Sequence, residues 1–250
     1  MVVTAGSDDR AHGVAEVRSR LRQAVLRTEL EPGVVYAQDE VRQLVAAGRT
    51  PFREALRMVQ VEKLVDILPN GRLMVPELSM EDFTQVQIAR ISMEAAAARL
   101  SIPRLEPENL AHLEGYMAQM SHYVNSDHFD RVEKPHRDFH RGILAHAGET
   151  IVLKIDELSD RIGRYRWAYS VELRSAWPNR TAEHRAILDA VNAGDVEGAV
   201  TQLVRHYLNA GLLLAEFMEA TSGPGGGDRF RDAILVSLAP DVRAAVSRLS

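Results

Sequence analysis

The stretch from Arg49 to Val75 constrains the fold of this chain more than any other part of the sequence. In its first half, residues 50–61, apolar side chains recur at helical spacing, and arginines recur every four residues on another side. The apolar positions are Phe52, Ala55, Leu56, Val59 and Val61, and the cationic positions are Arg49, Arg53 and Arg57. Pro51 lies in the first turn, where a helix does not use its N–H. The pattern predicts a helix with one buried side and one cationic side, although such a side is more often a solvated face than a nucleic-acid contact.

The second half of this stretch changes from helical spacing to strand spacing. Two short apolar runs, residues 64–68 and 73–75, flank the turn Pro69-Asn70-Gly71. Apolar runs separated by such a turn predict a β-hairpin. A cationic helix followed directly by a small hairpin is typical of a winged DNA-binding domain.

Two further helices are predicted before the cationic one. Val17–Leu30 is amphipathic, and Glu31-Pro32-Gly33 is expected to end it. Asp39–Ala47 predicts a second, short helix, and a turn at Ala47-Gly48 leads to Arg49. This order of elements predicts a winged helix-turn-helix domain over residues 16–78, preceded by a flexible tail of residues 1–15.

Residues 17–77 resemble the N-terminal domain of GntR-family bacterial regulators, most closely in the motif Arg49-Thr50-Pro51-Phe52-Arg53-Glu54-Ala55-Leu56-Arg57. The resemblance implies that Arg49 and Arg53 approach base edges or phosphates, with Thr50 at the DNA backbone. It also implies that the hairpin tip enters the neighbouring minor groove. The implied DNA-binding residues are Arg49, Thr50, Pro51, Arg53, Arg57, Asn70, Gly71 and Arg72. Two positions depart from the family pattern: Gly48 replaces the usual capping serine, and Asn70-Gly71-Arg72 replaces Asn-Arg-Gly.

Composition narrows the possibilities for the rest of the chain. The sequence has no cysteine, which excludes disulfides, thiolate metal sites and thiol nucleophiles. It shows no signal peptide and no apolar run of membrane-spanning length, so we expect a cytoplasmic protein. The net charge is −5, but Arg18, Arg20 and Arg22 are expected to share one cationic surface with the arginines of residues 49–57.

After residue 78 the sequence predicts helices only, so the fold class is mainly α. Ser79-Met80-Glu81-Asp82 has the spacing of a capping box. Six helices are expected in an antiparallel bundle over residues 79–222, at about 79–100, 107–124, 129–147, 150–165, 181–193 and 195–220. Residues 223–250 form a glycine-rich break and a C-terminal extension that could hold one or two short helices without an evident role.

Four histidines of this bundle could form a metal site. His136 and His140 lie four residues apart, so their rings project from one helix face, and His184 and His206 lie on two other predicted helices. Imidazoles on separate helices can converge on a divalent cation, with Zn²⁺ and Ni²⁺ both suited to nitrogen ligands. The alternative is that each histidine has only a structural or surface role.

Residues 80–221 resemble the all-helical FCD effector domain of the FadR-type GntR regulators. The resemblance rests on Phe139-His140-Arg141, on 183–190 beginning Glu-His-Arg, on Gly194-Asp195 and on His206, in this order. It implies a metal held by one aspartate and three histidines, and His136 stands at the aspartate position. An imidazole in place of a carboxylate leaves the site less negative, which favours an anionic effector and softer ions over Mg²⁺ or Ca²⁺.

Arg90 is the candidate effector-binding residue, because the resemblance includes an Arg-x-x-x-Glu segment from which arginine often reaches the pocket. A guanidinium beside a metal would bind a carboxylate in bidentate fashion. The alternative is that Arg90 and Glu94 only pair with each other on the surface.

Together these patterns predict a homodimeric transcriptional regulator, a repressor that binds a palindromic DNA operator and responds to a small carboxylate effector. One alternative is a metal-dependent hydrolase that uses the histidines; however, 136–140 lack the glutamate of an H-E-x-x-H motif, and no catalytic triad is recognisable. Another alternative is a metal-free regulator whose histidines contact the effector directly.

Overall fold

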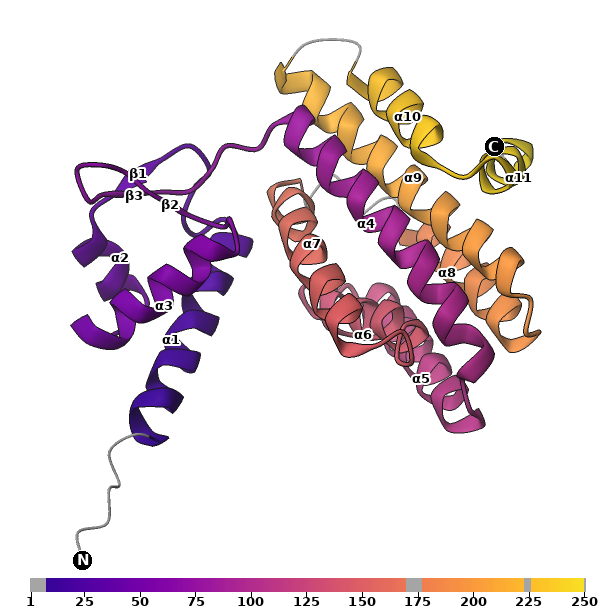
Figure 1. Cartoon of the computed structure of the whole chain (residues 1–250), viewed down its shortest axis with the longest axis horizontal. Coiled ribbons are helices and arrows are strands. Elements are labelled where there is room, and N and C mark those ends of the chain that lie inside the picture. The colour runs from indigo at the N-terminus through magenta and orange to yellow at the C-terminus, as the bar shows by residue number, and fades with distance from the viewer. Residues whose placement is uncertain (1–7, 170–176, 223–225, 250) are drawn as a thin grey trace, which may run out of the picture. The chain divides into compact units, whose positions relative to one another are not determined.

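The computed structural model describes residues 8–169, 177–222 and 226–249. These residues are mainly helical with one small sheet, which confirms the predicted fold class (Figure 1). The chain divides into two compact units: unit 1 comprises residues 1–79 and 163–168, and unit 2 comprises 80–162 and 169–250. Nowhere in the described ranges is a helix both long enough and apolar enough to cross a membrane.

Unit 1 contains a three-helix core and a three-stranded antiparallel sheet. Its helices are α1 (Asp8–Leu26), α2 (Gln38–Leu44) and α3 (Arg49–Val61), and its strands are β1 (Val35–Tyr36), β2 (Asp66–Ile67) and β3 (Leu73–Met74). The strand order is β1-β3-β2, with Leu73 opposite both Tyr36 and Ile67. Gly71 has a φ of +76° in the β2–β3 turn, a conformation that glycine adopts readily. The predicted winged helix-turn-helix architecture is thus present.

Two predictions for this unit need correction. The first helix begins at Asp8 and ends at Leu26, so it starts within the predicted tail and stops before Glu31-Pro32-Gly33. The chain leaves the helix at Thr28, which has a φ of +55°. Strand β1 was not predicted, because two residues are too few to show alternation and only pairing with β3 makes them a strand.

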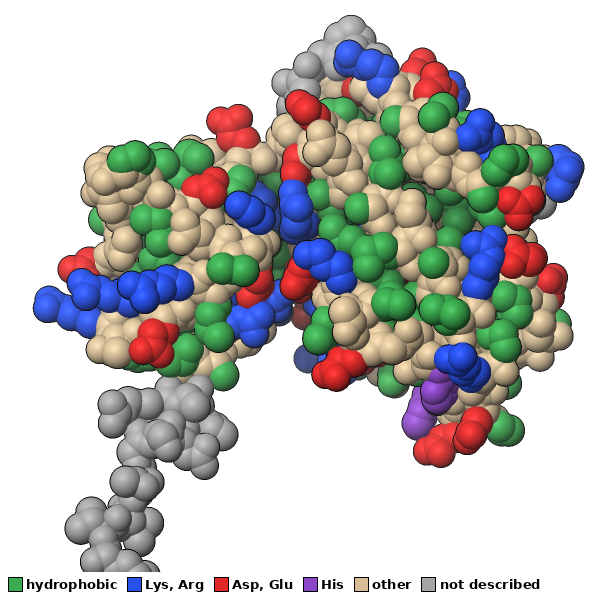
Figure 2. Space-filling view, in the orientation of Figure 1, with side chains coloured by type: hydrophobic (Ala, Val, Ile, Leu, Met, Phe, Trp, Pro, Cys, Tyr) green, Lys and Arg blue, Asp and Glu red, His purple; other side chains and the backbone are tan. Residues whose placement is uncertain are grey.

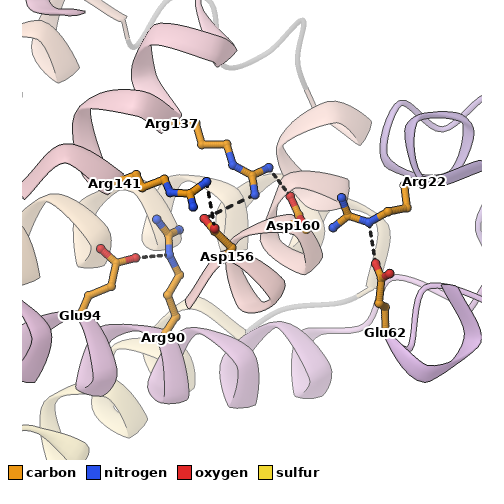
Figure 3. A network of polar contacts seen from close by, with 8 residues as sticks. All are labelled: Arg22, Glu62, Arg90, Glu94, Arg137, Arg141, Asp156 and Asp160. Carbon is orange, nitrogen blue, oxygen red and sulfur yellow. Dashed lines mark hydrogen bonds and ion pairs between the residues drawn. The ribbon is translucent and has the colours of Figure 1, made fainter. Parts of the chain in front are cut away.

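The apolar side of α3 packs against α1, and an ion-pair cluster joins the same two helices. Phe52, Leu56 and Val59 are buried in the core of unit 1, together with Leu21 of α1. Directly after α3, Glu62 accepts a hydrogen bond from Arg18 at 2.7 Å. It accepts another from Arg22 at 2.5 Å, which Figure 3 shows. Arg20 pairs with Glu16. All three arginines that were expected on the cationic surface are thus paired with carboxylates of unit 1, which reduces the positive charge that they add to it.

Unit 2 contains the six predicted bundle helices, except for residues 163–168 at the end of the fourth, which belong to unit 1. They are α4 (Met80–Ser101), α5 (Pro107–Asn125), α6 (Glu133–Ile143), α7 (Glu149–Ala168), α8 (Trp177–Asn192) and α9 (Val196–Ser222). Two boundaries differ from the prediction: 3-10 turn η2 (Phe129–Arg131) precedes a shorter α6, and α8 already begins at Trp177. Part of the joint predicted at 170–180, namely 170–176, lies outside the described residues.

The C-terminal extension also packs on the bundle, which the sequence did not predict. Helices α10 (Gly226–Ser237) and α11 (Pro240–Leu249) both pack against α9, and α10 also packs against α4 (Figure 1). Phe230 of α10 is fully buried and stacks on Phe83 of α4 with ring centroids 5.1 Å apart. Gly211 provides the space on α9, since an added Cβ there would lie 2.3 Å from Cζ of Phe230. The extension is therefore part of the core of unit 2.

Gly211→Ala tests this packing. We expect the substitution to lower the free energy of unfolding by about 1–3 kcal/mol, because the new methyl group must displace a buried ring. Gly115→Ala is the matched control, since Gly115 also lies inside a helix but its added Cβ would meet no atom within 4 Å. This control should instead stabilise the protein by about 0.5–1 kcal/mol. Equal urea midpoints for the two variants would contradict the described packing of α10.

Candidate functional site

The four predicted histidines form one buried cluster in unit 2. His136 and His140 come from α6, His184 from α8 and His206 from α9. One ring nitrogen from each lies within 4.8 Å of the other three. Nε2 of His140 is 3.3 Å from Nε2 of His136 and 3.2 Å from Nε2 of His184. The structure therefore brings together all four residues that the sequence nominated as metal ligands.

Three of these rings are oriented through their Nδ1 atoms. Nδ1 of His184 lies 2.7 Å from the carbonyl oxygen of Arg180, one helical turn earlier. Nδ1 of His206 lies 2.8 Å from Oε2 of Glu183, and Nδ1 of His140 lies 2.9 Å from the hydroxyl of Tyr207. Because a carbonyl and a carboxylate only accept, His184 and His206 donate from Nδ1, and their Nε2 lone pairs remain for another partner.

The electrostatic setting of the cluster disfavours a charged His184. Burial lowers the pKa of His184 well below its ordinary value, and the nearby imidazole of His206 lowers it further. All four side chains are among the buried residues, and the edge of Trp177 packs on His136 with ring centroids 5.7 Å apart. Neutral imidazoles with inward lone pairs are the form that binds metal ions.

The donor set fits a divalent transition metal. Four neutral nitrogen donors suit Zn²⁺ or Ni²⁺, whereas Mg²⁺ and Ca²⁺ prefer oxygen. The outward contacts of the Nδ1 atoms are of the kind that orients metal-binding histidines in general. Asp138 on α6 pairs with Lys134 and is not a member of the cluster.

Arg90 forms the ion pair with Glu94 that the sequence offered as the alternative to an effector contact. Nε of Arg90 donates to Oε1 of Glu94 at 2.7 Å. The pair is buried rather than on the surface, with Arg90 only 4% exposed and Glu94 only 1% exposed. The guanidinium also lies 4.3 Å from the ring centroid of Tyr207. Burial lowers the pKa of Arg90, but Glu94 and Tyr207 outweigh it and leave that pKa above its usual value.

Sequence reasoning did not connect three residues with the cluster: Glu94, which was considered only as a partner of Arg90, Glu183 and Tyr207. Glu183 accepts the hydrogen bond from His206. Glu183 and Tyr207 each adjoin a candidate ligand in the sequence, which was the available signal. Sequence spacing alone does not show which histidine Glu183 or Tyr207 contacts, because these contacts depend on how α4, α8 and α9 pack together.

A second face of α6 is attached to α7 by ion pairs. Arg137 donates to Asp160 at 2.5 Å and approaches Asp156 at 3.5 Å, and Arg141 lies 3.3 Å from Asp156 (Figure 3). These arginines each follow a cluster histidine by one residue. The contacts therefore fix the rotation of α6 about its axis, and with it the direction in which His136 and His140 project.

The cationic side of α3 forms a second candidate site, in unit 1. Arg49, Arg53 and Arg57 are all exposed, and within the described ranges no hydrogen bond or ion pair engages their guanidinium groups. Figure 2 shows a row of Lys and Arg side chains protruding from unit 1. A hollow of about 300 Å³ between α2 and α3 is lined by Gln38, Asp39, Arg42, Arg49, Phe52 and Arg53. Thr50 is exposed and Pro51 is half-buried at the start of α3. A helix with three free arginines suits the phosphates and base edges of a duplex.

The tip of the β2–β3 hairpin is exposed, and its side chains also form local contacts. Oδ1 of Asn70 accepts a hydrogen bond from the backbone N–H of Arg72 at 3.0 Å. Nη2 of Arg72 donates to the carbonyl of Val35 at 3.0 Å, and Gln38 donates to the carbonyl of Gly71 at 2.6 Å. The hairpin is thus tied to β1 and to the start of α2, and a minor-groove contact by Arg72 would require its side chain to swing out.

Comparison with known proteins places the chain in a family. Residues 85–209, which hold all four cluster histidines, match the FCD domain. The chain belongs to the FCD-domain family of GntR transcriptional regulators. Its winged helix-turn-helix and helical bundle correspond to the two parts that the sequence had predicted.

Individual relatives agree with this assignment. The chain is 26% identical to the HTH-type transcriptional repressor GlaR of Escherichia coli K12 over 199 residues, which are 75% of this chain and 89% of GlaR. It is 25% identical to the HTH-type transcriptional regulator McbR of the same organism, over 73% of this chain and 84% of McbR.

Two solved structures share the fold. The structure of E. coli McbR/YncC matches with a TM-score of 0.72 at 20% identity, covering 82% of this chain and 98% of that one. A putative GntR regulator from Rhodococcus sp. RHA1 matches with a TM-score of 0.64 at 19% identity, covering 80% and 96% respectively. The relatives are regulators of transcription and not enzymes, which confirms the expectation that this chain is not an enzyme.

Proposed function

We propose that this FCD-domain regulator is a homodimeric repressor whose operator affinity depends on a divalent metal and a small carboxylate effector bound in unit 2. The observation that carries the proposal is the convergence of four buried imidazole nitrogens within 4.8 Å of one another. Without a cation, the inward lone pairs of His184 and His206 would face other imidazoles across a short distance. A bound Zn²⁺ or Ni²⁺ would satisfy all four nitrogens and could present an open coordination position.

The charges around the cluster support an anionic effector. Imidazoles that coordinate a cation are neutral, so four of them would leave the two charges of a bound cation uncompensated. Two carboxylates lie near the cluster: Glu183 contacts His206, and Glu94 contacts Tyr207. The charge of the buried Arg90 offsets that of Glu94. The loaded site therefore keeps a net positive charge in a buried setting, and a carboxylate that coordinates the metal would neutralise it. Arg90 remains a proposed effector-binding residue. Because it is already paired with Glu94, the carboxylate of the effector would have to displace Glu94 or bind beside it.

The role of unit 1 in this proposal is operator recognition. Arg49 and Arg53 approach base edges or phosphates, and Arg57 contacts the backbone further along α3. A two-fold symmetric dimer would read two half-sites, so the operator should be palindromic. The printed name of the relative GlaR, a repressor, is the reason for proposing repression rather than activation.

Effector control follows from population shift. An anion that binds one arrangement of the bundle helices more tightly than another shifts the protein towards that arrangement. The helices that hold the cluster, α6, α8 and α9, belong to one packed unit, so a small change at the site alters their packing together. The operator affinity then changes by the ratio of the effector affinities of the two arrangements.

The experiment starts with selection of operator duplexes from a random library by the purified protein. Elemental analysis of protein prepared without chelator then identifies the metal, and mono- and dicarboxylates are titrated into the protein–operator complex with and without Zn²⁺. We expect two-fold symmetric selected sequences and at least a tenfold change in affinity with one class of acid, only in the presence of metal. An effector response in metal-free protein would instead support direct contact by the histidines.

A further inference from the structure

A chain of buried polar groups connects α4 to the imidazole cluster. Oε1 of Glu94 accepts from Arg90 at 2.7 Å, and Oε2 of the same carboxylate contacts the hydroxyl of Tyr207. The Tyr207 oxygen lies 2.9 Å from Nδ1 of His140. All four side chains are buried, so neighbouring water does not compete for these contacts.

The donors and acceptors of this chain can be arranged in only one way. A carboxylate that is paired with arginine is ionised and only accepts, so the single hydroxyl hydrogen of Tyr207 points towards Glu94. The Tyr207 oxygen can then only accept from His140, which must carry its proton on Nδ1.

We propose that Glu94 and Tyr207 are positioning residues that hold His140 in its Nδ1–H tautomer and so direct its Nε2 lone pair into the cluster. The importance of the His140 tautomer for metal binding rests on the proposed function above. Nε2 of His140 lies 3.3 Å from Nε2 of His136 and 3.2 Å from Nε2 of His184. A proton on that atom would block one ligand and place an N–H against the others.

His140 differs from the other two oriented rings in the nature of its partner. His184 and His206 face a carbonyl and a carboxylate, which only accept and therefore fix the tautomer directly. His140 faces a hydroxyl, which can either donate or accept. Glu94 removes this ambiguity by accepting from that hydroxyl, so Glu94 decides the tautomer of His140 through Tyr207.

Glu94→Gln follows from this reasoning as the decisive variant. The glutamine oxygen would still accept from Arg90, and its NH₂ group would then face the Tyr207 oxygen. Tyr207 would accept from the glutamine and turn its own hydrogen towards Nδ1 of His140, which would move the histidine proton to Nε2. The substitution nearly conserves shape, yet it should reverse the direction of the hydrogen-bond chain.

The primary measurement is the tautomer of His140 in metal-free protein labelled with ¹⁵N-histidine, by long-range ¹H–¹⁵N correlation, with His140→Gln used for assignment. We expect the Nδ1–H form in the wild type and the Nε2–H form in Glu94→Gln. Tyr207→Phe removes the hydrogen-bond partner of His140 altogether and should leave a mixture of the two tautomers.

Glu62→Gln and Tyr165→Phe are the matched controls. Glu62 is an arginine-bound carboxylate of unit 1, and Tyr165 is a buried tyrosine whose hydroxyl donates to the carbonyl oxygen of Ser79. Both controls should retain the wild-type tautomer.

The second measurement is affinity for Co²⁺, followed by its visible absorption, and for Zn²⁺ by competition. Loss of an outer partner of a metal-binding histidine typically lowers metal affinity 10- to 100-fold, and we expect this loss in Glu94→Gln and Tyr207→Phe but not in the controls. An Nε2–H tautomer in the wild type, or an unchanged tautomer in a folded Glu94→Gln protein, would overturn the inference. If the tautomers behave as expected but the wild type binds neither ion, the metal site of the proposed function fails while the role of Glu94 and Tyr207 in orienting His140 stands.

Discussion

Removal of the bound divalent ion should lower the free energy of unfolding by about 4 kcal/mol when the free ion had been present at about a thousand times its dissociation constant. The proposed ion site is made by three separate helices, α6, α8 and α9, which the unfolded chain cannot assemble. Binding to the folded state alone therefore adds directly to stability. Urea unfolding of protein dialysed against a chelator, with and without restored Zn²⁺ or Ni²⁺, measures the difference.

Histidine variants separate this effect from general destabilisation. His184 is fully buried within the cluster, so His184→Ala should abolish the response to metal as well as lowering the stability of metal-free protein. His112→Ala is the control, because His112 is exposed on α5 and lies outside the cluster. Unfolding curves of the wild type that do not change with chelator or metal would show that the cluster serves packing alone.

Replacement of Arg49 or Arg53 by alanine should weaken operator binding by about 1–3 kcal/mol for each bidentate base contact that is lost. Both guanidinium groups are exposed on α3, and alanine is a good helix former, so folding should be unaffected. If Arg57 contacts a phosphate, Arg57→Ala should instead weaken binding to all duplexes and reduce the salt slope by about one. Fluorescence anisotropy with a selected operator and a scrambled duplex, at several salt concentrations, measures these effects.

Arg20→Ala provides the matched control for this series. Arg20 is an exposed arginine of unit 1, but it lies on α1 and pairs with Glu16. We expect its replacement to leave both operator affinity and salt dependence close to those of the wild type. Unchanged operator affinity in both Arg49→Ala and Arg53→Ala would refute the assignment of α3 as the DNA-reading helix.

Local patterns account for the parts that were predicted correctly. The spacing of Phe52, Leu56 and Val59 places them on one side of a helix in any environment, and the structure buries all three. The turn before Arg72 likewise forces the chain to reverse. His136 and His140 share a face because they lie four residues apart, and the family pattern then related them to His184 and His206.

Other features depended on partners distant in the sequence. The expected cationic surface included Arg18 and Arg22, but both are bound to Glu62 after α3. The C-terminal extension had no predicted role, because the complementarity of Phe230 with Phe83 and Gly211 exists only when three helices are packed together. Periodicity shows which side of a helix is buried, but it does not show which helix covers that side.

The sequence by itself determined the two-part architecture, the exposed arginines of α3 and the identity of the four clustered histidines. These properties follow from residue spacing and from a family motif, both of which act within short segments. Only the tertiary structure decided that Glu94 and Tyr207 lie behind His140 and that Glu183 lies behind His206. These contacts join α4, α8 and α9 to the cluster, and hydrogen-bond partners are set by the rotation and separation of packed helices, which residue spacing within one helix does not specify.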